Sequence, residues 1–262
     1  AFLTAEPNFE LLQQLATRYQ KLDTLVLIAN GGSSNTFVGY HGLFSAKSSK
    51  RVFFIQSPDP AYISEVLATA TPERTLVLSI SKSGENVAQL EAMSQFAGYP
   101  MFVVTEPTSP LAQIARGFEA EVIDHPPIGG RYTGLTDVGL LPAALCGFDV
   151  RALFAGGRSL QDQFETSNIA WNAASVFWQL EQSGHVDVFV PLYSHGLAAT
   201  GLSIQQICHE SFGKSGLGQS YITLEAPEWQ HHTAQRFFGG RKNVAGFFVR
   251  TSEQGNPRAV SY

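Results

Sequence analysis

Short apolar runs alternate with amphipathic stretches along the first 125 residues. The runs predict buried parallel strands at residues 24–29, 51–55, 75–80, 100–104 and 121–124. Between them, apolar residues recur at helical spacing, which predicts helices that begin near residues 8, 35, 60, 87 and 110. This alternation is typical of an α/β fold in which helices cover both faces of a parallel sheet, as three αβα layers.

The same alternation begins again in the second half of the chain. A Pro- and Gly-rich loop at 126–136 is followed by predicted helices at 138–145 and 167–182. Predicted strands at 186–192, 220–224 and 244–249 then enclose a predicted helix at 197–212. We therefore expect two consecutive α/β units, with limits at 1–154 and 155–262.

Composition narrows the class of protein. Of the 262 residues, 44% are hydrophobic and only 15% are charged, against roughly 25% charged in an average domain. The net charge of −5 argues against nucleic acid as the main partner. No apolar run approaches the ~18–20 residues of a membrane span. Two cysteines are too few for a disulfide framework or a zinc site, which favours a cytoplasmic protein without a metal.

Both ends of the sequence resemble interior positions of a longer polypeptide. The chain begins with Ala1 rather than methionine, and residues 251–257 have the composition of a loop. We therefore expect the protein to continue past Tyr262, and the second unit to be incomplete at its C-terminus.

Two loops at predicted strand ends have the composition of an anion site. The first is 30–34, where Gly31 and Gly32 let a phosphate approach the main chain and Ser33 and Ser34 offer hydroxyl groups. The alternative for this loop alone is a helix start capped by serine. Because no Gly-x-Gly-x-x-Gly or Walker motif is present, a monophosphate is favoured over a nucleotide.

The second loop, 79–84, has similar chemistry. Ser79, Ser81 and Ser83 offer hydroxyl groups, and Lys82 adds a positive charge. Ligands of parallel α/β sheets bind at the carboxyl ends of the strands. Two such loops on neighbouring strands therefore favour one shared phosphate site.

Further candidates follow in the glycine-rich segment and the second half. Arg131, in Gly129–Thr133, can reach across a ligand, or it can pack on Tyr132. Glu225 follows a predicted strand directly, whereas Glu228 is predicted on a turn. The histidines show no carboxylate at metal-ligand spacing, so His195 and His209 are not expected to take part in a metal site.

Taken together, these motifs resemble the glucose-6-phosphate isomerase family, which is built from sugar isomerase (SIS) domains. The resemblance implies two SIS-like domains, the first at 1–154 and the second at 155–262. It further implies interconversion of glucose 6-phosphate and fructose 6-phosphate through an enediolate, a step of glycolysis and gluconeogenesis that requires no cofactor. The matching segments run in the family's order along the chain: Gly31–Ser33, Asp59–Leu67, Ser79–Gly84, Gly129–Thr133 with Val138–Leu145, Glu210–Lys214, and Glu225 with Gln230–His231.

The resemblance also implies residue roles. Glu225 is the implied base, because a carboxylate can take and return a carbon-bound proton, and Arg131 stabilises the enediolate charge. The residues implied to line the phosphate and substrate site are Gly32, Ser33, Ser81, Lys82, Ser83, Gln206 and Glu210. A homodimer is implied as well, because active sites of the family borrow a histidine from the neighbouring subunit. The low charge and the aromatic stretch 229–238, which we expect to be exposed, favour the same assembly.

The sequence departs from the family at three places. Glu85 and Asn86 stand where the family has two threonines, and residues 226–229 replace a glycine-containing loop after the base. The family's ring-opening histidine and C-terminal lysine are expected after Tyr262. Two alternatives therefore stay open: a sugar-phosphate-binding module without turnover, or an isomerase segment of a bifunctional carbohydrate enzyme.

Overall fold

The computed structural model describes residues 6–164 and 166–251, and the chain forms two compact units, 1–169 and 170–262. The limit expected at 154/155 falls inside helix α7 (Val150–Phe164), which the sequence pattern did not predict. The domain limits 1–154 and 155–262 stay a prediction. The loop expected after Thr251 lies outside the described residues.

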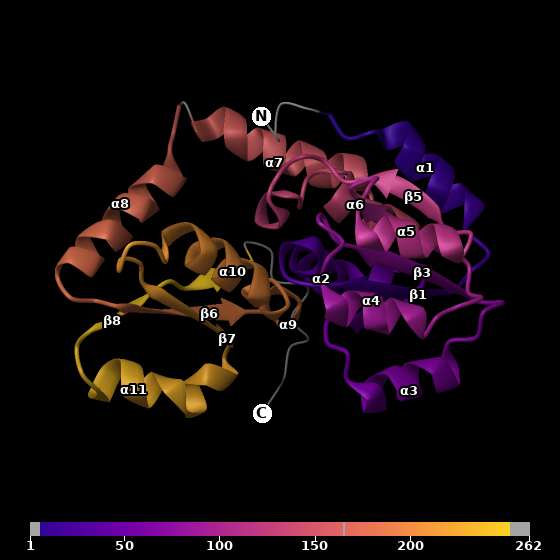
Figure 1. The fold of residues 1–262 in the computed structure, drawn as a ribbon. Helices are drawn as coiled ribbons and strands as arrows, with labels where there is room; N and C mark the ends of the chain where they lie inside the picture. The colour runs from indigo at the N-terminus through magenta and orange to yellow at the C-terminus, as the bar shows by residue number, and fades with distance from the viewer. Residues whose placement is uncertain (1–5, 165, 252–262) are drawn as a thin grey trace, which may run out of the picture. The chain divides into compact units, whose positions relative to one another are not determined.

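The first unit is built on a parallel sheet of five strands in the order β2-β1-β3-β4-β5 (Figure 1). Apolar residues dominate the first four strands, and the three central strands are buried along their whole length. The predicted α/β fold with a parallel sheet is confirmed. The strands are β1 (Thr24–Ala29), β2 (Arg51–Ile55), β3 (Thr75–Ile80), β4 (Met101–Thr105) and β5 (Glu121–Asp124).

Helices cover both faces of this sheet. Alternate residues of β1 point to opposite faces, so that Leu25 and Leu27 enter one core while Val26 and Ile28 enter the other. The first face is covered by α1 (Phe9–Arg18), α2 (Gly32–Phe44), α6 (Asp137–Leu145) and α7. The second is covered by α3 (Pro60–Thr69), α4 (Val87–Ser94) and α5 (Pro110–Gly117). Two 3-10 turns, η1 (Ser45–Lys47) and η2 (Gly130–Tyr132), complete the unit.

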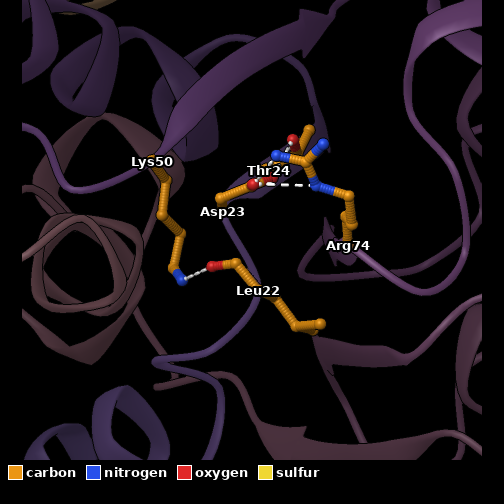
Figure 2. Close-up of polar contacts among 5 residues, drawn as sticks. All are labelled: Leu22, Asp23, Thr24, Lys50 and Arg74. Atoms are coloured by element: carbon orange, nitrogen blue, oxygen red, sulfur yellow. Dashed lines mark hydrogen bonds and ion pairs between the residues drawn. The ribbon is translucent and has the colours of Figure 1, made fainter.

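A buried lysine fastens the amino-terminal edge of the sheet (Figure 2). Lys50 is only 5% exposed. Its ammonium donates to the carbonyl of Tyr19, at 2.9 Å, and to that of Leu22. Nearby, the Asp23 carboxylate accepts from the Arg74 guanidinium, with Nε 2.9 Å away. Burial lowers the pKa of Lys50, yet the two carbonyls accept two of its three ammonium hydrogens and tie the end of α1 to the start of β2.

The second unit has a smaller parallel sheet with β6 at its centre. Strand β6 (Asp187–Tyr193) pairs with β7 (Ser220–Glu225), β8 (Val244–Gly246) and β9 (Val249–Arg250). The single strand expected at 244–249 is thus two short strands. The helices of this unit are α8 (Ile169–Gln182), α9 (His195–Ala198), α10 (Gly201–Phe212) and α11 (Thr233–Gly239), with a 3-10 turn η3 (Glu228–His231).

Two apolar clusters hold the second unit together. Side chains of α8, α9 and α10 pack with Val188, Val190 and Leu192 of β6. A separate cluster around Trp229 and Phe237 includes residues of η3 and α11, and Figure 1 shows α10 and α11 on opposite sides of the sheet. Trp229, in the stretch expected to be exposed, is 2% exposed, so that expectation is wrong there. Phe238 is 65% exposed.

Candidate functional site

The loop after β1 turns directly into a helix. Gly31 has φ of +54°, in the left-handed region that glycine adopts without strain, and α2 begins at Gly32. The predicted start near residue 35 is therefore wrong by about one turn. Ser33 lies in the first turn of α2, where backbone N–H groups have no acceptor within the helix and the helix dipole favours an anion.

A network of amides joins the carboxyl ends of neighbouring strands. The amide nitrogen of Gln89, on α4, lies 3.3 Å from the Ile28 carbonyl of β1 and 2.8 Å from the Ile80 carbonyl of β3. Asn86, which caps α4, donates to the Asn30 side chain at 3.4 Å. Because β1 and β3 pair in parallel, both candidate phosphate loops lie at the same edge of the sheet.

The loop after β3 is shaped by its own serines. The hydroxyl of Ser81 accepts from the Gly84 N–H at 3.2 Å, and that of Ser83 accepts from the Glu85 N–H at 3.4 Å. Each hydroxyl therefore keeps its own hydrogen for donation to a ligand. Ser79 does not belong to this set, because it lies inside β3, paired with Ile28 and Val103, and is fully buried.

Lys82 is held through its backbone. Its carbonyl accepts from the Glu106 N–H at 3.1 Å and from the Thr105 hydroxyl at 3.3 Å, which ties the loop to the end of β4. Beside it, His125 follows β5 and is 5% exposed, with Nδ1 2.7 Å from the Pro126 carbonyl. Burial lowers the pKa of His125, and the Lys82 charge acts in the same direction. A neutral His125 leaves Lys82 as the positive charge of this loop.

The glycine-rich segment 129–133 packs against the start of α2. A Cβ on Gly32 would lie 2.1 Å from the Gly130 carbonyl carbon and 2.3 Å from the Arg131 nitrogen. The Thr133 hydroxyl closes the segment by donating to the Gly130 carbonyl at 2.6 Å. Gly32 thus brings the segment into contact with the first phosphate loop, and its lack of a side chain serves this packing.

Arg131 packs on Tyr132, which was one of the two arrangements considered for it from the sequence. Its guanidinium carbon lies 4.7 Å from the centre of the Tyr132 ring, a cation–π distance. Its backbone stands at the edge of the phosphate loops, because of the contact with Gly32. The structure therefore places the Arg131 backbone beside Gly32, while the preceding Gly130 lies next to Ser33.

In the second unit, Glu225 is the last residue of β7, one position further into the strand than predicted, since the strand was expected to end at residue 224. Its carboxylate Oε1 lies 3.0 Å from Nδ1 of His195, and 47% of the Glu225 side chain is exposed. From the sequence, His195 was considered only for metal-ligand spacing, and this contact was not predicted. The two residues are 30 positions apart in the sequence, so their spacing does not indicate the pair. His195 follows β6 and Glu225 ends β7, and the parallel pairing of these two strands is the signal that would indicate it.

Gln206 and Glu210 lie one turn apart on α10. The Gln206 amide nitrogen donates to Glu210 Oε1 at 2.9 Å. The helix approaches β7 closely at Gly201, whose Cβ would lie 2.6 Å from the Thr223 hydroxyl. Glu228, predicted on a turn, lies in η3 and is exposed.

Other features of the described residues lie apart from these loops. One groove, of about 780 Å³, is lined by residues of α1, by Ser49 and by residues 144, 145 and 147–151, and by none of the three loop segments. Within 6–164 and 166–251, no three His, Cys, Asp or Glu side chains gather as a metal site would require. No helix in those ranges has the length and apolar character to cross a membrane.

The fold is of the SIS type of α/β architecture. Its architecture is shared by the C-terminal domain of glucosamine-fructose-6-phosphate aminotransferase from Francisella tularensis, with a TM-score of 0.53 at 15% identity over 92% of this chain and 66% of that one. It also matches the crystal structure of a glucose-6-phosphate isomerase from Chlamydia trachomatis, with a TM-score of 0.80 at 25% identity over 91% of this chain and 52% of that one.

Sequence comparison also finds proteins named glucose-6-phosphate isomerase. A glucose-6-phosphate isomerase of Rubrobacter xylanophilus is 29% identical over 84% of this chain and 55% of its own length. One of Acaryochloris marina is 31% identical over 72% of this chain and 40% of its own length. No family model matches the chain. The resemblance to glucose-6-phosphate isomerases is confirmed, and the chain spans about half the length of the curated relatives it matches.

Proposed function

We propose that this chain is the main part of an aldose–ketose isomerase that interconverts glucose 6-phosphate and fructose 6-phosphate. Its similarity to proteins named glucose-6-phosphate isomerase carries the proposal. Two phosphate-type loops at one sheet edge and a carboxylate at the end of β7 supply the required chemistry. We place the reaction in the cytoplasm, where free cysteines such as Cys146 and Cys208 are ordinary.

The first unit would hold the phosphate group. Gly32 and Ser33 begin α2, whose positive end favours an anion. Ser81 and Ser83 add hydroxyl donors, and Lys82 adds charge. The exposed Glu85 lies next to this site, since its N–H donates to the Ser83 hydroxyl. Its carboxylate is therefore a local cost that Lys82 would offset.

The second unit would supply the base. Glu225 takes the proton from C2 of the open-chain aldose, and the C–H electron pair becomes the double bond of a C1–C2 enediolate. Return of that proton to C1, with proton transfer between the two oxygens, gives the ketose. Arg131 would stabilise the enediolate charge, and Gln206 and Glu210 would contact the sugar. The reaction is redox-neutral and needs no cofactor.

A sugar-phosphate-binding module without turnover is the second candidate. The observation that favours it is the segment after the base, where Ala226 and Trp229 are buried in a small apolar cluster. A coupled assay for fructose 6-phosphate with the full-length protein separates the two functions. Measurable turnover supports the isomerase, and binding without turnover supports the module. A bifunctional polypeptide would show as a second enzymatic domain in the complete gene.

Removing the hydroxyls of the second loop should weaken phosphate binding. In the double variant Ser81→Ala and Ser83→Ala, two donors to a charged group are lost, so we expect affinity to fall by ~1–3 kcal/mol. Calorimetry with glucose 6-phosphate measures the change. The matched control is Ser64→Ala with Ser94→Ala, two exposed helix serines whose hydroxyls, among the described residues, donate to carbonyls of their own helices. Equal affinity in both double variants would rule out this placement.

We also propose that the protein is a homodimer. Support comes from α8, where Trp171 and Trp178 lie two turns apart on one face and are 64% and 63% exposed. Sedimentation at micromolar concentration should give the mass of two chains, and Trp178→Glu should shift it toward one, because a buried unpaired charge opposes association. A wild-type protein that sediments only as a monomer contradicts the proposal.

A further inference from the structure

His195 and Glu225 meet at the carboxyl ends of two adjacent strands. Strand β6 pairs in parallel with β7, and Leu192 stands opposite Glu225 in that register. His195 follows β6 as the first residue of α9, so it stands three positions beyond the residue opposite Glu225. Its Nδ1 lies 3.0 Å from Glu225 Oε1. The contact therefore follows from strand register as well as from side-chain geometry.

The backbone around His195 is held on both sides. The preceding Ser194 caps α9, and its hydroxyl oxygen accepts from the Leu197 N–H at 3.4 Å. One residue earlier, the Tyr193 hydroxyl accepts from the Gln230 amide at 3.0 Å and from the Trp229 indole at 3.3 Å. These contacts fix the point from which the imidazole reaches Glu225.

The chemistry of the contact sets the direction of the hydrogen bond. A carboxylate only accepts, so Nδ1 of His195 carries the hydrogen and donates it. Within residues 6–164 and 166–251, His195 is the side chain that donates to the Glu225 carboxylate. The bond engages Oε1 and leaves Oε2 for proton transfer.

We propose that His195 is a positioning residue for the base: its Nδ1–H holds Oε1 of Glu225, so that Oε2 faces the carbon-bound proton. The inference rests on the proposed isomerase function, in which Glu225 is the base. The His195 side chain is 94% exposed, and exposed polar contacts contribute little to stability. Its removal should therefore change the rate of proton transfer and leave folding intact.

Three substitutions distinguish the effect of the hydrogen bond at Nδ1 from the effect of side-chain size alone. His195→Asn places an amide N–H where Nδ1 stands, His195→Gln places it where Nε2 stands, and His195→Ala removes both. With full-length protein we measure exchange of the C2 proton in deuterated solvent. We expect exchange to fall about tenfold in the Gln and Ala variants, below the roughly hundredfold that a 1 Å misplacement costs. The Asn variant should keep wild-type exchange, and KM should change little in all three.

A second measurement reads the contact without any turnover. Long-range proton–nitrogen NMR of the imidazole should show the Nδ1–H tautomer at His195 in the wild type and the Nε2–H tautomer in Glu225→Ala. An Nε2–H tautomer in the wild type, or Asn and Ala variants that exchange at the same rate, overturns the proposal. If Glu225→Gln retains exchange, the proposed base is wrong, and the tautomer still decides whether the contact exists.

Discussion

Replacing Glu225 by glutamine should abolish exchange of the C2 proton with deuterated solvent. The change keeps the size of the side chain and removes its basicity, and a positioned acid–base group contributes about 10²–10⁴-fold to rate. Phosphate binding should stay within twofold of wild type, because the loops that we assign to it belong to the other unit. The measurement is NMR exchange of an open-chain or equilibrating sugar phosphate by full-length protein.

The structure supplies one matched carboxylate control and one alternative base for this experiment. Glu228, in η3, is exposed and should tolerate the same Glu-to-Gln change without loss of exchange. Glu210, on α10, accepts from Gln206 and is the next candidate for the base. If Glu225→Gln exchanges at the wild-type rate and Glu210→Gln does not, the base assignment passes to Glu210.

The strands of the first unit were predictable because burial on both faces leaves a continuous apolar run. Thr24–Ala29 and Thr75–Ile80 are buried at every position, and both were found at their observed limits. Helix α7 was missed, because Gly156 and Gly157 lie in its middle and glycines usually interrupt helices. A Cβ on Gly157 would lie 2.1 Å from Leu135 Cδ1, so the tertiary contact explains this glycine.

The parts of the candidate site that follow a single strand could be predicted from the sequence. The contact that depends on how two strands pair could not. Loops 30–34 and 79–84 follow single strands, and the pairing of β1 with β3 confirms that these strands are neighbours. The contact of His195 with Glu225 depends on the pairing of β6 with β7, which local sequence does not encode. Ser79 was misassigned to the loop, because it lies inside the strand that was itself correctly predicted at 75–80, and its side chain is fully buried there.

Gly32→Ala should displace the segment 129–133 from the start of α2. The new Cβ would stand 2.1 Å from the carbonyl carbon of Gly130 and 2.3 Å from its oxygen, and both belong to backbone that cannot rotate away. Overpacking of this kind typically costs ~1–3 kcal/mol, and a backbone clash belongs at the upper end. We expect a lower midpoint in chemical denaturation and, because Arg131 moves with the segment, slower turnover in the full-length protein.

Gly156→Ala is the matched control for this substitution. Gly156 lies in α7, and among the described residues nothing beyond the backbone of its own helix comes within 4 Å of the position that a Cβ would take. Alanine should therefore raise stability by up to ~1 kcal/mol through helix propensity. The two substitutions add the same methyl group, and only the packing differs. If Gly32→Ala unfolds at the wild-type midpoint and keeps wild-type turnover, segment 129–133 does not pack on α2 as described, and the placement of Arg131 beside the phosphate loops is wrong.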